Sequence, residues 1–265
     1  MNSVRDAGIV VTGGGSGIGA ALARRFAGEG ARVVVNDING EAASAVAASC
    51  GATAVPGDAA SQDGVAALIA SARAALGEID IYCANAGIVR SGGPEAADPD
   101  WDASWQVNVM AHVRAARLLI DPWLARGSGH LICTVSAAGL LAMPGTASYS
   151  VTKHAALSFA EWMALTYAHR GLTVQAICPL GVRTAMLDGS DPGAELVLGD
   201  AVITPEAVAD AVIKAIADGR FLILPHPEVA AMYAGRAADP DRWLHGMNKI
   251  QRRVEEALAG PSGAA

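Results

Sequence analysis

The stretch VVTGGGSGIGAALARRF at residues 10–26 decides the fold of this chain. An apolar run, GIVVT at 8–12, leads into a cluster of glycines, and the residues after the cluster have the apolar spacing of a helix. Glycines between a strand and a helix let the backbone turn sharply and let a pyrophosphate approach the helix N-terminus, where free N–H groups favour negative charge. The stretch therefore predicts a strand, a phosphate-binding loop and a helix.

Short apolar runs alternate with longer helical stretches through most of the chain. Their hydrophobicity is continuous, as in strands buried on both faces. This order predicts an α/β fold of the doubly wound Rossmann type, a seven-stranded parallel sheet with helices on both faces. We expect a single domain over 1–265, with a core at about 8–224 and a helical tail at 225–265. The predicted strands are 8–12, 31–35, 52–55, 79–84, 129–135, 172–178 and 220–224.

The composition excludes several classes of partner. The net charge of −7 argues against nucleic acid, because proteins that bind it usually present a basic face. No apolar run approaches the roughly 18 residues of a membrane span, and no signal peptide is evident, so we expect a cytoplasmic protein with no membrane partner. The cysteines and histidines lack metal-ligand spacing, so no metal site is expected; the cysteines fit free thiols in a reducing compartment. These residues include Cys50, Cys83, Cys133, Cys178, His154, His226 and His245.

The glycine spacing departs from the general fingerprint GxGxxG. It reads TGxxxGIG, with Thr12 and Gly13 followed by Gly17, Ile18 and Gly19. In this form the chain resembles the short-chain dehydrogenase/reductase family, in its branch of shorter single-domain members. The resemblance implies an oxidoreductase that binds a nicotinamide dinucleotide at this loop.

An acidic residue about twenty positions after such a loop is expected to bind the adenosine ribose hydroxyls. Asp37, at the end of VVVND, has this place. A carboxylate here repels a 2′-phosphate, so we predict NAD in preference to NADP. Ser16 indicates the same, because relatives that prefer NADP often carry a basic residue there. The alternative is that Asp37 only caps the next helix.

The resemblance continues at the ends of later strands. Asp58 resembles the family aspartate that contacts the adenine amino group, and NAG at 85–87 resembles the NNAG turn, with Ala84 replacing its first asparagine. CPLGVRT at 178–184 resembles Pro-Gly-x-Val-x-Thr, which holds the nicotinamide carboxamide, with Leu180 in place of the glycine. The predicted cofactor-binding residues are Gly13, Gly15, Ser16, Gly17, Ile18, Gly19, Asp37, Ile38, Asp58, Ala59, Asn85, Ala86, Gly87, Tyr149, Lys153, Pro179, Val182 and Thr184.

The stretch YSVTKHAAL at 149–157 places Tyr149 and Lys153 one helical turn apart on the same face. Ser136 follows the fifth strand, and the carboxyl ends of parallel strands line the ligand crevice, so these side chains are expected to meet. Together with Asn108 they match the family's catalytic tetrad.

The chemistry explains these residue types. A hydride leaves an alcohol carbon only if the hydroxyl proton leaves too, so a base is required. We predict that Tyr149 is this acid/base, with its pKa lowered by the Lys153 ammonium and the oxidised nicotinamide. Ser136 would donate a hydrogen bond to the substrate oxygen. By resemblance, Lys153 also binds the nicotinamide ribose and Asn108 holds a water of a proton relay.

The segment between Thr184 and Thr204 is where the family places its mobile substrate lid. Its apolar residues, with those after the fifth strand, indicate an apolar pocket. The predicted pocket residues are Ser136, Ala138, Leu141, Met143, Met186 and Leu187, with Leu140, Leu196, Val197 and Leu198 nearby.

The tail carries apolar residues at helical spacing. We expect this face to cover the protein's own core, with a subunit contact or a substrate lid as the alternatives. These residues are Trp243, Met247, Ile250, Val254 and Leu258.

The sequence as a whole predicts an NAD-dependent oxidoreductase that interconverts a secondary alcohol and a ketone. The expected substrate is a largely apolar small molecule. A homotetramer is implied by the resemblance alone. Two alternatives stay open: an NAD-binding regulator without catalysis on the same fold, and an epimerase or dehydratase. The latter relatives usually carry a TGxxGxxG loop and a larger C-terminal domain, which this chain lacks.

Overall fold

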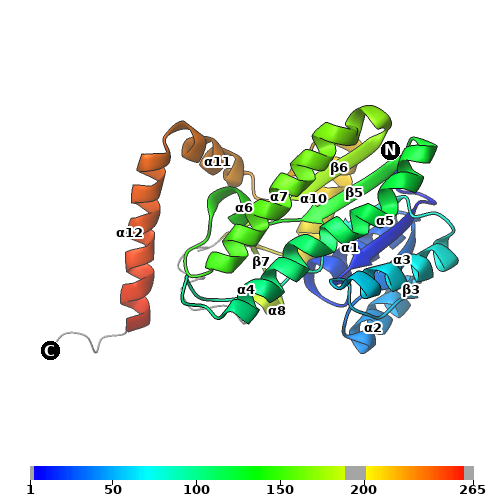
Figure 1. Cartoon of the computed structure of the whole chain (residues 1–265), viewed down its shortest axis with the longest axis horizontal. Coiled ribbons are helices and arrows are strands. Elements are labelled where there is room, and N and C mark those ends of the chain that lie inside the picture. Colours follow the sequence, from blue (N-terminus) through cyan, green and yellow to red (C-terminus); the bar gives the residue numbers. More distant parts are fainter. Residues whose placement is uncertain (1–2, 189–200, 260–265) are drawn as a thin grey trace.

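The structure is a computed structural model that describes residues 3–188 and 201–259 (Figure 1). Seven strands form one parallel sheet in the order β3-β2-β1-β4-β5-β6-β9, which confirms the predicted doubly wound fold. The direction of winding reverses between β1 and β4, so a ligand crevice is expected beyond their carboxyl ends. The strands are β1 (Gly8–Thr12), β2 (Arg32–Asn36), β3 (Thr53–Ala54), β4 (Ile81–Ala84), β5 (Gly129–Thr134), β6 (Leu172–Ile177) and β9 (Leu222–Ile223).

Two apolar layers enclose the sheet, because side chains alternate between its faces. Val10 belongs to the core cluster on one face, and its neighbours Ile9 and Val11 belong to the cluster on the other. All three are fully buried. One face is covered by α3 (Gln62–Leu76), α5 (Ala111–Arg126) and α7 (Ala147–Tyr167), and the other by α1 (Gly17–Gly28), α2 (Gly40–Cys50) and α10 (Pro205–Asp218).

Shorter elements complete the described chain. A five-residue π-helix, η1, lies between α4 and α5, and β7 pairs in parallel with β8 in a separate small sheet. The other elements of the described chain, short apart from α11 and α12, are α4 (Asp98–Trp105), η1 (Gln106–Met110), α6 (Ala138–Leu141), η2 (Ala168–Arg170), β7 (Gly181–Val182), α8 (Ala185–Asp188), β8 (Val202–Ile203), α11 (Glu228–Ala238) and α12 (Pro240–Ala259).

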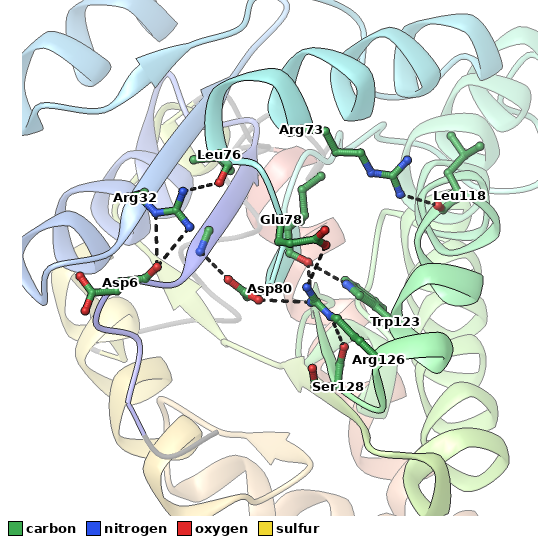
Figure 2. Close-up of polar contacts among 12 residues, drawn as sticks. Asp6, Arg32, Arg73, Leu76, Glu78, Asp80, Leu118, Trp123, Arg126 and Ser128 are labelled. Carbon is green, nitrogen blue, oxygen red and sulfur yellow. Dashed lines mark hydrogen bonds and ion pairs between the residues drawn. The ribbon is translucent and has the colours of Figure 1, made fainter.

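The amino ends of the strands are closed by a polar cluster around Arg126, at the end of α5 (Figure 2). Its guanidinium donates to the carbonyls of Ser128 and Ile79, at 2.7 and 2.8 Å, and pairs with Asp80 at 3.3 Å. Asp80 in turn accepts from the Gly8 N–H at 2.7 Å. This end of the sheet is thus occupied by structural contacts, which leaves the carboxyl ends for chemistry.

The tail forms two helices, α11 and α12, at one end of the molecule beside α6 (Figure 1). Arg236 of α11 donates to the Leu140 carbonyl and to His154 Nε2, the latter at 3.1 Å. Trp243 of α12 packs against the main core, as predicted, and Val254 is buried. Met247 and Ile250 instead line a cavity, so the prediction that this whole face covers the core was only partly right.

Three further features of the described residues concern cysteines, metal sites and membrane-spanning helices. All four cysteines are free, and Cys83, Cys133 and Cys178 are buried. In the described part of the chain no group of three or more His, Cys, Asp or Glu side chains could hold a metal ion. Nor does any helix within 3–188 or 201–259 have the length and hydropathy to cross a membrane.

Candidate active site

The glycine loop between β1 and α1 has a shape that only glycine permits. Gly13 and Gly17 have φ angles of +61° and +50°, which other residues rarely adopt. At Gly19 a Cβ would lie 2.1 Å from the Gly13 carbonyl oxygen. The first hydrogen bond that enters α1 runs from the Ala20 N–H to the Ser16 carbonyl, at 3.0 Å. The helix N–H groups before Ala20 therefore have no helical acceptor and favour an anion.

We predict that Gly19→Ala weakens NAD binding about 10-fold or more, because the added Cβ must displace the Gly13 carbonyl and with it the loop. Gly28→Ala is the matched control, since it lies in the same helix and its Cβ would meet no atom within 4 Å. Isothermal titration calorimetry measures both affinities. Equal affinities in the two variants would contradict a cofactor role for the loop.

Asp37 follows β2, and two backbone N–H groups orient its carboxylate. Oδ2 accepts from the Gly15 N–H and Oδ1 from the Asn39 N–H, each at 2.9 Å. The residue that caps α2 is Asn39, whose side chain accepts from the Ala42 N–H at 3.1 Å. The interpretation of Asp37 as a helix cap is therefore wrong, and its carboxylate borders the loop instead.

Asp58 lies after β3, and its carboxylate binds the turn that follows. It accepts from the Ala60 and Ser61 N–H groups at 2.8 and 3.1 Å. Burial opposes ionisation of Asp58, but these hydrogen bonds and the Arg114 guanidinium outweigh it, so the pKa of Asp58 lies below its usual value. A fixed anion is therefore available near the loop.

Asn85 connects the carboxyl ends of three central strands. Its Nδ2 donates to the Thr12 carbonyl at 2.9 Å, and its Oδ1 accepts from the Thr134 hydroxyl at 3.0 Å. The Thr12 hydroxyl accepts from the N–H groups of Asn85 and Ala86, both at 3.0 Å. The turn at 85–87 thus joins the carboxyl ends of these central strands, and the alanine at position 84 does not disturb these contacts.

One cavity of about 340 Å³ runs along these carboxyl ends. Of the predicted cofactor residues, Gly15 and Val182 are absent from its lining: Gly15 contacts Asp37, and Val182 is buried in the core. Met186, predicted for the substrate pocket, lies in this lining instead. The predicted residues that line it are Gly13, Ser16, Gly17, Ile18, Gly19, Asp37, Ile38, Asp58, Ala59, Asn85, Ala86, Gly87, Tyr149, Lys153, Pro179 and Thr184.

Tyr149 and Lys153 lie on the same face of α7, at the wall of this cavity. The Lys153 Nζ lies 5.6 Å from the centre of the Tyr149 ring and donates to the Thr134 carbonyl at 2.9 Å. Burial lowers the pKa of Lys153 to about 8. Burial also raises the pKa of Tyr149, and a hydrogen bond with Ser136 opposes this only in part. In the protein alone the pKa of Tyr149 is thus raised, and its lowering by Lys153 together with the oxidised nicotinamide stays a prediction.

Asn108 reaches the same region from η1. Its Oδ1 accepts from the Ile88 N–H, and its Nδ2 donates to the Ile88 carbonyl and the Thr152 hydroxyl, at 2.9, 2.9 and 3.1 Å. A Cβ on Gly87 would lie 3.3 Å from both Asn108 Oδ1 and Lys153 Nζ, so the two side chains flank this glycine. Both N–H groups of the Asn108 amide are engaged. A water of a proton relay would therefore have to donate a hydrogen bond to an acceptor atom of Asn108.

His112, one turn beyond Asn108, was not singled out from the sequence. Its ring is buried, and neither ring nitrogen has a hydrogen-bond partner within the described residues. Burial, followed by the charge of Lys153, lowers the pKa of His112 to about 3. The ring is therefore neutral at ordinary pH and adds no positive charge near Lys153.

A second cavity, of about 560 Å³, begins at Ser136 and is mostly apolar. Four of the predicted pocket residues line it: Ser136, Ala138, Leu141 and Met143. Leu187 is half-buried and lines neither cavity, and Leu140 is buried in the core. Leu196, Val197 and Leu198 lie outside the described residues.

The tail supplies the opposite wall of this second cavity. The apolar spacing in α12 is visible in the sequence, but nothing in the sequence indicates that this face lines a cavity. The tail residues in the lining are Met232, Gly235, Ala238, Asp239, Arg242, Trp243, Gly246, Met247 and Ile250.

Tyr149 lines the first cavity and Ser136 lines the second, and Ser136 is near enough to oppose the rise of the Tyr149 pKa. A molecule in the apolar cavity can thus present an oxygen to both side chains while a dinucleotide occupies the first cavity. This arrangement suits proton transfer coupled to hydride transfer.

Comparison with known proteins gives consistent matches. The family described as short chain dehydrogenase matches residues 7–194. The chain is 35% identical to 1-deoxy-11-beta-hydroxypentalenate dehydrogenase of Streptomyces exfoliatus, over 89% of this chain and 88% of that protein. It is 36% identical to 2,5-dichloro-2,5-cyclohexadiene-1,4-diol dehydrogenase of Sphingobium indicum, over 71% and 77% of the two chains. A short chain dehydrogenase/reductase from Burkholderia phymatum in complex with NAD has a TM-score of 0.82 at 28% identity, covering 91% of this chain and 96% of that one.

Proposed function

The chain belongs to the short-chain dehydrogenase family, and from this premise we propose that it interconverts a secondary alcohol and a ketone with NAD. The observation that carries the proposal is the placement of Tyr149 in the wall of the first cavity and of the nearby Ser136 in the wall of the second. One cavity has the phosphate-binding loop and the other has an apolar lining next to the reacting groups.

The residues of the first cavity fit a nicotinamide dinucleotide, because glycines leave room for it and free N–H groups favour its pyrophosphate. The N-terminus of α1 would hold the pyrophosphate, Asp37 the adenosine ribose and Thr184 the nicotinamide end. Asp37 supports NAD over NADP, because its oriented carboxylate opposes a 2′-phosphate. When bound, the cofactor supplies the hydride acceptor or donor.

Tyr149 takes the hydroxyl proton in the oxidation direction and returns it in the reduction direction. Its pKa is raised in the protein alone, so phenolate forms only when positive charge comes near, from Lys153 and the oxidised nicotinamide together. Ser136 holds the substrate oxygen where negative charge develops. Lys153 keeps its ammonium beside Tyr149 through its bond to the Thr134 carbonyl.

An apolar alcohol fits the second cavity, whose polar groups are few. The two named relatives act, by their names, on a hydroxypentalenate and a cyclohexadiene diol, both hydroxyl-bearing. The regulator alternative is disfavoured by the complete set of Asn108, Ser136, Tyr149 and Lys153. The epimerase or dehydratase alternative is disfavoured because the glycine loop reads TGxxxGIG and not the TGxxGxxG of those relatives.

Assembly and location are also part of the proposal. Apolar side chains on the outer faces of α5 and α7 are exposed, and they would suit contacts between subunits of a homotetramer. They are Leu118, Val151, Trp162 and Leu165. The free buried cysteines support a reducing compartment, the cytoplasm.

A panel of linear and cyclic secondary alcohols with NAD tests the proposal, with cofactor reduction followed by absorbance. We expect turnover with apolar alcohols and calorimetric binding of NAD without any alcohol. A protein that binds no NAD would refute the proposal. Binding of NAD without turnover of any alcohol would favour the regulator alternative.

A further inference from the structure

His226 lies in the turn between β9 and α11, and both of its ring nitrogens are used. Nδ1 accepts from the Leu180 N–H at 3.1 Å. Nε2 lies 3.0 Å from the Ala201 carbonyl, so it carries the proton and donates. The ring is only 2% exposed. One buried neutral imidazole thus joins two backbone segments that are 21 residues apart in the chain.

These two segments lead into the small parallel sheet. Leu180 directly precedes β7 and Ala201 directly precedes β8, which pair through Gly181 with Val202. The pairing continues where the Arg183 N–H donates to the Ile203 carbonyl at 2.9 Å. His226 therefore fastens both strands of this sheet at their beginnings.

The turn that His226 holds lies between the two cavities. Pro179 and Thr184 line the dinucleotide cavity, whereas Leu180 lines the apolar cavity and packs on the core. The family places a glycine where this chain has Leu180. The Leu180 side chain and the acceptor on its N–H therefore fix a turn that glycine would leave freer.

We infer that His226 is a positioning residue that sets this turn against the nicotinamide end of the cofactor. The inference rests on the proposed function, because it requires that the nicotinamide end lies beside Thr184. His226 acts through the backbone from Leu180 to Thr184 and makes no contact with cofactor or substrate itself. Loss of the Leu180 contact should weaken binding of the nicotinamide end and leave binding of the adenosine end unchanged.

Two substitutions separate the two contacts of the ring. In His226→Asn the amide takes the place of Nδ1 and can still accept from Leu180. In His226→Gln the amide reaches the place of Nε2, so it keeps Ala201 and leaves the Leu180 N–H without its acceptor. His169→Gln is the matched control, because His169 is exposed in η2.

Calorimetric titrations with NAD and with ADP-ribose, which lacks nicotinamide, give the readout. We expect His226→Gln to weaken NAD binding about 5- to 10-fold with ADP-ribose affinity unchanged, as for one lost hydrogen bond. His226→Asn and His169→Gln should bind both ligands like the unmodified protein. ADP-ribose affinity also reports whether each variant is folded.

Three results would overturn the inference. They are unchanged NAD binding in His226→Gln, an equal loss of NAD and ADP-ribose affinity in it, or an Asn variant as weak toward NAD as the Gln variant. If His226→Gln does not fold, the Asn variant decides. It keeps the Leu180 contact and loses the Ala201 contact, so the inference then requires that it binds NAD with normal affinity. Failure of the unmodified protein to bind either ligand would refute the proposed function instead.

Discussion

Tyr149→Phe should lower kcat for alcohol oxidation about 10³-fold, within the range that general acid–base catalysis contributes. The variant keeps the ring beside Lys153 but removes the phenol hydroxyl that we propose takes the hydroxyl proton. Affinity for NAD should stay within about 3-fold, because we propose that the loop and Asp37 hold most of the dinucleotide. Steady-state kinetics and calorimetry measure the two quantities.

Tyr167→Phe is the control for this experiment, since Tyr167 lies at the far end of the same helix and packs edge-to-face on Trp162, away from both cavities. It should leave kcat unchanged. Substantial turnover by Tyr149→Phe would remove Tyr149 as the acid/base and transfer the proton step to another group. A parallel loss of NAD binding would mean that the substitution damaged the site as a whole.

The pH dependence follows from the charge states of the same pair. Burial disfavours the charged form of each group: it raises the pKa of Tyr149 and lowers that of Lys153 to about 8, so the two pKa values lie further apart than they would in water. Phenolate and ammonium therefore need each other's charge, and the oxidised nicotinamide adds a second cation. Oxidation is accordingly favoured as the pH rises toward about 8 and disfavoured above it, where Lys153 loses the charge that stabilises the phenolate.

The sequence was most informative where one structure explains a residue pattern. Continuous apolar runs such as VVV in β2 occur where both faces of a strand are buried, and all seven predicted strands were found. The glycine loop was also predictable, because Gly19 has no room for a side chain. The predicted and observed ends of the strands differ by one or two residues, because strand ends fray and no sequence pattern marks them.

Features that depend on packing between distant segments were not predictable. The apolar spacing around Trp243 and Met247 indicates a buried face but does not say what covers it, and the structure shows a cavity wall. Nothing near His226 in the sequence indicates that its ring binds Leu180 and Ala201. Burial of Tyr149, which raises its pKa, was not predictable either, because it arises only in the folded chain.

Asp37→Ala should reduce the preference for NAD over NADP about 10²-fold, measured as the ratio of kcat/KM for the two cofactors. The carboxylate contributes in two ways: it accepts hydrogen bonds from the ribose hydroxyls, and it repels a 2′-phosphate. Gly15 and Asn39 hold it in one orientation, so both effects act at a fixed place. Removal of the side chain should therefore lower kcat/KM for NAD and raise kcat/KM for NADP.

Glu41→Ala is the matched control, because Glu41 is an exposed carboxylate in the first turn of α2, close to Asp37 in the sequence. It changes the net charge by the same amount without touching the loop. If general electrostatics set the preference, both variants would shift the ratio alike, and the shift would shrink with added salt. A shift confined to Asp37→Ala requires the oriented carboxylate, whereas a parent protein that already uses both cofactors equally would refute this role of Asp37.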